Sequence, residues 1–272
     1  MTTAFRDPQP KGLFFDVFGT CVDWRKTVTD TLYKSAKEAL DSSSSISSDV
    51  RSRASAMTYE QWGEIAQEWR NTYYAFTRAI ANDASLRYKT VDQHHLEALQ
   101  EILSNRGLVT SDSTGSLWNE EKVLQLSLVW HYLDPWSDTV QGLAMLNKKF
   151  TTATLSNGNV ALLEDMKAHA KMPFTHIYSS EMFQSYKPSP KVYLGAAEKM
   201  GLKPEECMMV AAHLDDLKHA KSNGFRTLYV ERPREERNLE WLAEEAKAWV
   251  DVWVKMEEDG FVAAAEKLGI GK

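Results

Sequence analysis

The sequence predicts an α/β protein, with a Rossmann-like parallel sheet core, helices on both faces of the sheet and an inserted helical cap domain. Short apolar runs rich in Val, Thr, Tyr and Phe alternate with segments of helical periodicity, which is typical of parallel strands covered on both faces. The exception is a long segment, 25–133, which contains helical patterns but no good strand. One large domain with an insertion suits a chain of 272 residues.

Each expected strand is a short apolar run followed by turn residues. The first is 12–18, and four more follow the long helical segment: 150–156, 175–180, 206–212 and 225–230. The run 248–254 alternates weakly between apolar and polar residues, so we expect an edge strand there. The last segment, 259–272, has the pattern of a closing helix.

Apolar spacing identifies the helices of the insertion. The clearest helix carries an apolar stripe at three- and four-residue spacing, formed by Trp62, Ala66, Trp69, Tyr73, Phe76 and Ile80. Helical patterns follow near 91–106 and 118–132, and a helix over 136–149 leads back to the sheet. The serine-rich segment 41–49 and the charged run 231–237 predict exposed loops. The expected domains are a Rossmann-like core and a helical cap, over 1–24 with 134–272 and over 25–133 respectively.

Composition and charge argue against several classes of protein. Apolar residues make up 43% of the chain and charged residues 26%, an ordinary globular balance. The net charge of −6, without a large basic block, argues against binding to nucleic acid or to an anionic membrane. No apolar run approaches the ~20 residues of a membrane helix, and the N-terminus lacks the apolar segment of a secretory signal. With two cysteines, Cys21 and Cys207, we expect free thiols and a cytoplasmic location.

Polar side chains follow four of the expected strands, at the point where each strand ends. In an open parallel sheet, ligands bind in the crevice outside these carboxyl ends. The helical insertion follows the first strand, so it would lie over that crevice and close it. The four groups are Asp16 with Gly19 and Thr20, then Ser156, Asn157 and Gly158, then Lys187 with Pro188, and last His213, Asp215 and Asp216.

Each group has a structural interpretation as well as a functional one. Asp16 lies within an apolar run, where an unpaired carboxylate is unfavourable, so it needs a cation such as Lys187 and would form at least a salt bridge. Ser156 and its neighbours suit an anion at a helix start, yet they would equally serve as an N-cap. Asp215 and Asp216 would also compensate a helix dipole. The order of all four groups, each after a strand, favours a catalytic site.

These four groups resemble the four motifs of the haloacid dehalogenase superfamily, and the similarity covers nearly the whole chain, the cap included. Within the superfamily, the sequence is most similar to the L-2-haloacid dehalogenases of type II. The features that carry this similarity are the first motif DVFGTCVDW with its Phe18, the segment 155–158, Tyr186-Lys187-Pro188 followed by Tyr193, and Trp69-Arg70 in the cap. The resemblance implies a hydrolase that displaces halide from a short 2-haloalkanoic acid and forms a 2-hydroxy acid.

The resemblance also implies the catalytic residues. Asp16 would be the nucleophile that forms an ester with the substrate, and Thr20 would orient it. Lys187, with Tyr193, would stabilise charge on the carboxylates. Asp216 would position Lys187 and the hydrolytic water.

Four further residues would bind the substrate, a small-molecule carboxylate. Phe18 would form an apolar wall, and Ser156 with Asn157 would hold the substrate carboxylate. Arg70 would receive the departing halide. An apolar face of the cap would support a homodimer, as in the resembled family.

The fourth motif departs from the family pattern Ser-Ser-Asn-x-x-Asp. The segment 211–216 reads Ala-Ala-His-Leu-Asp-Asp, so the first serine is lost and His213 replaces the asparagine. We expect His213 to polarise the water through a neutral ring that is both donor and acceptor, and a hydrogen bond at the helix start is the alternative. Asp215 replaces a family aromatic, which would make that wall of the pocket more polar.

A Mg²⁺-dependent phosphatase of the same superfamily is the main alternative. A phosphate ester expels an alkoxide, which needs a general acid, and family phosphatases place a second Asp two residues after the nucleophile. Phe18 stands there and has no proton to give, whereas a halide leaves without one. Ala211 and Ala212 stand where the family's Mg²⁺ site has a carboxylate directly after the strand, so we expect no metal or cofactor. Only the phosphatase alternative would use Mg²⁺, at a shifted site formed by Asp16 and Asp215. A third hypothesis, a catalytically silent binding protein, conflicts with the intact motif residues.

Overall fold

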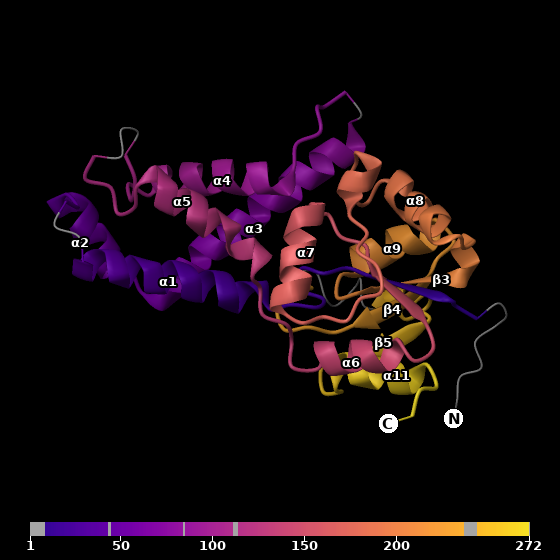
Figure 1. Cartoon of the computed structure of the whole chain (residues 1–272). Helices are drawn as coiled ribbons and strands as arrows, with labels where there is room; N and C mark the ends of the chain where they lie inside the picture. The colour runs from indigo at the N-terminus through magenta and orange to yellow at the C-terminus, as the bar shows by residue number, and fades with distance from the viewer. Residues whose placement is uncertain (1–8, 43–44, 84, 111–113, 237–243, 272) are drawn as a thin grey trace.

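The computed structural model describes residues 9–42, 45–83, 85–110, 114–236 and 244–271. Their core is a five-stranded sheet in the order β2-β1-β3-β4-β5, and every neighbouring pair of strands is parallel. Helices cover both faces of the sheet, as the sequence predicts (Figure 1). The strands are β1 Gly12–Phe15, β2 Thr151–Thr154, β3 Cys207–Ala211, β4 Arg226–Val230 and β5 Val252–Val254.

Alternate residues of β1 enter opposite layers of the core, because successive side chains of a strand point to opposite faces. Phe14 enters one layer, and Leu13 and Phe15 enter the other. Since β1 lies between β2 and β3, the strand order reverses there and opens a crevice at the carboxyl end, where Asp16 follows. Among the helices described in full, α8 (Pro190–Met200) and α9 (Leu214–Ser222) cover the face of Phe14. The face of Leu13 and Phe15 is covered by α6 (Thr139–Leu146), α7 (Val160–His169) and α11 (Gly260–Lys267).

The helical insertion forms a lobe beside the sheet (Figure 1). Capping boxes begin two of its helices, where Thr58 pairs with Gln61 and Thr90 pairs with Gln93. No helix in the described part of the chain is long and apolar enough to cross a membrane. The elements of the lobe are α1 Trp24–Ser42, α2 Ser48–Ala56, α3 Tyr59–Asn82, α4 Val91–Asn105, α5 Glu120–Ser127 and the 3₁₀ turn η1 Leu128–His131.

Two linkers join the lobe to the sheet, and they lie side by side. Val22 forms an antiparallel bridge with Pro135, and the Asp23 N–H donates to the Asp134 carbonyl at 2.9 Å. We propose that the cap begins and ends at these linkers, at the boundaries near 24 and 134 that the sequence predicts.

Several expected elements are confirmed, and others differ. The edge strand and the closing helix are present as β5 and α11, and both cysteines are buried free thiols. The exposed loop expected over 41–49 is shorter, because α1 reaches Ser42 and α2 begins at Ser48; residues 43 and 44 lie outside the described residues. The helix expected over 118–132 is divided into α5 and η1.

The expected third strand, 175–180, is not a regular strand. The Thr154 hydroxyl accepts a hydrogen bond from the Tyr178 N–H and donates one to the Tyr178 carbonyl, both at 2.9 Å. The Tyr178 N–H therefore pairs with a side chain, while the Tyr178 carbonyl also accepts a backbone bond from the Ser156 N–H at 3.4 Å. What remains is a pair of isolated bridges, Ala153 with His176 and Ser156 with Ser179.

Candidate active site

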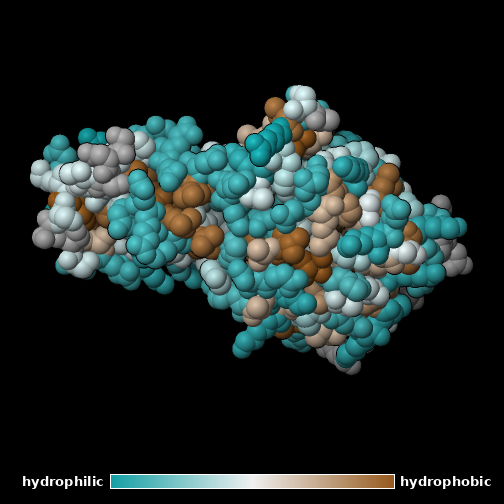
Figure 2. Space-filling view, turned by 45° about the horizontal axis from the view of Figure 1, so that its top comes forward, coloured by the Kyte–Doolittle hydropathy of each residue, from teal (hydrophilic) through white to brown (hydrophobic). Residues whose placement is uncertain are grey.

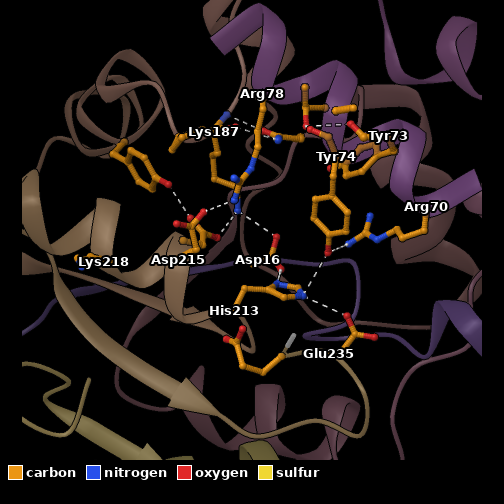
Figure 3. A pocket seen from close by; sticks show the side chains of 17 residues that line it. Asp16, Arg70, Tyr73, Tyr74, Arg78, Lys187, His213, Asp215, Lys218 and Glu235 are labelled. Carbon is orange, nitrogen blue, oxygen red and sulfur yellow. Dashed lines mark hydrogen bonds and ion pairs between the residues drawn. The ribbon is translucent and has the colours of Figure 1, made fainter. Parts of the chain in front are cut away.

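Asp16 is a buried carboxylate that three side chains hold at the carboxyl end of β1. Figure 3 shows Lys187 and His213 beside it. Lys187 donates from Nζ to Oδ1 at 3.0 Å, and Thr20 donates from Oγ1 to Oδ2 at 2.8 Å. His213 Nδ1 lies 3.0 Å from Oδ2. Burial alone would raise the pKa of Asp16, but the charges and hydrogen bonds of Lys187 and His213 hold it well below its usual value. Asp16 is therefore ionised at neutral pH.

Lys187 joins Asp16 to a second buried carboxylate. The ammonium lies 2.6 Å from Oδ2 of Asp216, in the first turn of α9, and the Tyr193 hydroxyl on α8 donates to Oδ1 of Asp216 at 2.6 Å. Burial would lower the pKa of Lys187, but the two carboxylates raise it above its usual value. The structure thus brings together the expected nucleophile, the ammonium and the acid of the fourth motif.

His213 stands between two carboxylates. Its Nδ1 faces Asp16, its Nε2 lies 3.1 Å from Oε2 of Glu235, and the Tyr74 hydroxyl lies 3.5 Å from the same Nε2. An ionised carboxylate only accepts hydrogen bonds, so both ring nitrogens donate and the ring is an imidazolium. Burial would lower the pKa of His213, but Tyr74 and the two carboxylates raise it well above its usual value. The structure therefore favours a charged ring over the neutral ring expected from the sequence.

Glu235 is a site residue that sequence reasoning missed. The charged run 231–237 predicted a solvated loop, yet Glu235 is 7% exposed and Arg232 in the same run is also 7% exposed. Glu235 accepts a hydrogen bond from the Trp24 indole at 2.8 Å in addition to its contact with His213. No local pattern marks a glutamate whose partners lie elsewhere in the chain. Residue 237 lies outside the described residues.

Arg70 brings a buried cation from the cap helix α3 to the site. Its Nη2 donates to the Phe18 carbonyl at 3.3 Å and to the Tyr74 hydroxyl at 3.0 Å. The guanidinium carbon also lies 4.5–5.6 Å from the centres of four aromatic rings, those of Phe18, Trp24, Tyr73 and Tyr74. Nε and Nη1 have no hydrogen-bond partner among the described residues, so two buried donors remain for an anion.

Asn157 holds the backbone of Lys187. Its side-chain oxygen accepts from the Lys187 N–H at 2.8 Å and from the Ser180 hydroxyl at 2.8 Å, and Nδ2 donates to the Lys187 carbonyl at 3.3 Å. Ser156 is fully buried, and its hydroxyl accepts from the Gly158 N–H at 3.2 Å. Their role with the substrate carboxylate stays a prediction, because these contacts show only how both side chains support the loops.

The side chains from core and cap converge on one cavity of about 540 Å³. Figure 3 shows Asp16, His213 and Glu235 on one side of it, with Arg70 and Tyr74 approaching from α3. Asn157, Lys187, Tyr193 and Asp216 also line the cavity. Phe18 is 2% exposed and packs edge-on against Tyr73 and Trp130, so it forms an apolar layer two residues after Asp16.

Comparison with known proteins gives the family. The haloacid dehalogenase-like hydrolases match residues 10–224. The chain belongs to this family. An (S)-2-haloacid dehalogenase of Pseudomonas putida, H-109, is 25% identical over 226 residues, which cover 82% of this chain and 86% of the relative. One from Xanthobacter autotrophicus is 30% identical over 195 residues, 69% of this chain and 72% of the relative. The crystal structure of a defluorinating L-2-haloacid dehalogenase has a TM-score of 0.76 at 28% identity, over 97% of this chain and 98% of that one.

The acidic groups of this hydrolase do not fit the metal site of the phosphatase alternative. Asp215 on α9 forms an ion pair with Arg78 of the cap at 2.6 Å, and both side chains are more than half exposed. Both oxygens of Asp16 already have partners: Oδ1 contacts Lys187, and Oδ2 contacts His213 and the Thr20 hydroxyl. Within the described ranges, no three His, Cys, Asp or Glu side chains are grouped as metal ligands. We therefore derive no step through a metal.

Proposed function

We propose that this hydrolase displaces halide from a short 2-haloalkanoic acid and releases a 2-hydroxy acid. The observation that carries the proposal is the buried, ionised carboxylate of Asp16 two residues before the apolar Phe18. A nucleophile without a proton donor at that position suits a leaving group that is a weak base, and halide is one. The relatives named (S)-2-haloacid dehalogenases support this substrate class.

In the first step, a carboxylate oxygen of Asp16 attacks the carbon that bears the halogen. The new C–O bond forms as the C–halogen bond breaks, so the carbon inverts and an aspartyl ester results. The halide leaves with its electron pair, and we assign its binding to Arg70, whose Nε and Nη1 lack partners among the described residues. Asn157 lines the cavity, and its Nδ2 has a second hydrogen besides the one it donates to the Lys187 carbonyl. We therefore assign Asn157, together with Ser156, to binding of the substrate carboxylate.

In the second step, water attacks the ester carbonyl carbon of Asp16. Oxyanion charge develops there, next to the Lys187 ammonium, which lies 3.0 Å from Oδ1 and is held by Asp216. The bond between Cγ of Asp16 and the ester oxygen then breaks, so the departing 2-hydroxy acid keeps that oxygen as its hydroxyl and Asp16 takes the oxygen of the water. Asp16 returns to the ionised state in which its cations stabilise it.

The test is halide release from L-2-chloropropionate and bromoacetate in the presence of excess chelator, with Asp16→Asn as the control. We expect the wild type to release halide and the variant to release none. If the wild type releases no halide but hydrolyses a generic phosphate ester on addition of Mg²⁺, the proposal is wrong and the phosphatase alternative is correct.

We also propose the homodimer that an apolar cap face would support. Figure 2 shows apolar groups on the lobe amid a mostly hydrophilic surface. Leu124, Leu128 and Tyr132 are exposed at four-residue spacing along α5 and η1. Light scattering of the purified protein at several concentrations tests the assembly, and a monomer at all of them would contradict it.

A further inference from the structure

The carboxylate of Glu235 is held by contacts to three separate segments. Oε1 accepts from the Trp24 indole at the start of α1, and Oε2 faces His213 Nε2. Gly19 packs against the same carboxylate with φ at +84°, and any Cβ there would collide with it. His213 is its ion-pair partner among the described residues. Because Glu235 contacts Nε2, it is Nδ1 of the His213 ring that points to Asp16.

The charge on His213 depends on the state of Asp16. In the free enzyme, two carboxylates and the Tyr74 hydroxyl surround the ring, and the cations Arg70 and Lys187 lie one contact further out. When Asp16 becomes an ester it loses its charge, so one of the two groups that stabilise the imidazolium is lost. A ring with a single carboxylate partner holds its proton less tightly, and Nδ1 becomes free to accept one.

We propose that His213 is the proton acceptor for ester hydrolysis and that Glu235 is the positioning residue that orients it and sets its basicity. This inference rests on the proposed function, since it concerns the ester on Asp16. His213 Nδ1 already lies 3.0 Å from the group that water attacks. Asp216 is less available for this task, because its two oxygens accept hydrogen bonds from Lys187 and Tyr193.

The protons balance over the two steps. As the ester forms and halide leaves, His213 releases its proton to solvent and becomes neutral. Water then adds to the ester carbonyl, one of its protons goes to His213 Nδ1, and the other ends on the oxygen of the departing 2-hydroxy acid. Asp16 is again a carboxylate and His213 is again an imidazolium, which is the state of the free enzyme. Glu235 takes no part in the proton transfer and keeps its contact with Nε2 of the ring.

The test compares Glu235→Gln with a matched control, Glu231→Gln. Glu231 also accepts from an indole, that of Trp253 on the edge strand β5 at 2.7 Å, but it does not line the cavity. With L-2-chloropropionate, we expect Glu235→Gln to release one halide per site at the wild-type rate and then to turn over about 10²-fold more slowly. Intact-mass measurement should show the ester accumulating on Asp16. Glu231→Gln should match the wild type.

A pH profile separates positioning from a merely structural role. The acid limb of kcat reports protonation of His213 in the ester state, so Glu235→Gln should move it to lower pH by about one unit. His213→Asn should show the same burst of halide with no such limb. If Glu235→Gln does not fold, Trp24→Phe, which removes the indole donor to Glu235 together with part of a buried ring, should give a smaller shift of the acid limb in the same direction.

The outcomes distinguish this inference from the proposed function. Equal loss of burst and turnover in Glu235→Gln, or an unchanged acid limb, would overturn the role of Glu235 while leaving the dehalogenase proposal intact. A wild type that releases no halide at all would overturn the proposed function itself, and this inference with it.

Discussion

Removing the ammonium of Lys187 should destabilise the fold strongly at neutral pH. Its Nζ lies 3.0 Å from Asp16 and 2.6 Å from Asp216, and all three side chains are buried. At an effective dielectric constant of about 20, a pair at this distance interacts by about 5 kcal/mol. Part of that is offset by desolvation, and removal of one partner from a buried pair costs about 3–5 kcal/mol. We expect this loss of unfolding free energy for Lys187→Met at pH 7.5.

The loss should shrink as the pH falls. In the wild type, the folded-state pKa of Asp16 lies below its unfolded value of about 3.9, so its stabilising contribution is present above that pH and is lost on further acidification. In Lys187→Met, burial and the like charge of Asp216 raise the carboxyl pKa values. The variant therefore gains stability by taking up a proton as the pH falls towards about 5.

Urea unfolding at pH 7.5 and pH 5, followed by tryptophan fluorescence and circular dichroism, measures both effects. Lys218→Met is the control, because Lys218 forms an exposed pair with Glu245 at 2.9 Å and should contribute less than about 1 kcal/mol. A loss below about 1 kcal/mol for Lys187→Met at pH 7.5 would refute the reasoning. So would an equal loss at both pH values.

Three further predictions concern neighbouring residues. Arg70→Met should leave the melting temperature unchanged or raise it, because Nε and Nη1 of this desolvated guanidinium have no partner among the described residues and the group contributes little stability. Halide release should fall by about 10²-fold, and a large loss of stability would contradict this. Gly19→Ala should destabilise the protein by at least about 1–2 kcal/mol, because φ of Gly19 is +84° and the new Cβ would meet Glu235. An unchanged melting temperature by calorimetry would be inconsistent with that packing. The rate of the halide burst should stay constant from about pH 8 to about pH 4, because the lowered pKa keeps Asp16 ionised over this range. A fall in the burst rate near neutral pH, measured by rapid quench, would count against this prediction.

Much of the fold follows from local patterns. The runs that became β1, β2, β3 and β4 are short and made mostly of apolar residues and threonine, because both faces of each strand are buried apart from Thr151 and Arg226 at two strand starts. The expected strand over 175–180 has the same composition, yet the Thr154 hydroxyl takes the hydrogen bonds of Tyr178. A contact between a side chain and the backbone of a residue far along the chain leaves no mark in the local pattern.

The site, like the fold, has some features that the sequence predicts and others that depend on contacts between distant segments. The order of Asp16, Lys187 and Asp216 along the chain predicts their meeting, because the carboxyl ends of parallel strands lie at one edge. The part played by Glu235 was not predictable, since its charged neighbours indicate a solvated loop and its partner Trp24 is 211 residues away. The ionisation of His213 was not predictable either, because it depends on both carboxylates.

The sequence alone determined five of the six expected strands, the helical insertion and the motif residues, because strand length, helical period and the chemistry of side chains are properties of neighbouring residues. Only the tertiary structure decided that Arg70 reaches the carbonyl of Phe18, that Glu235 is buried and that His213 is charged. These features depend on distances and burial between segments far apart in the chain. Electrostatic energies vary steeply with both quantities, so a small difference in packing decides the charge of a side chain.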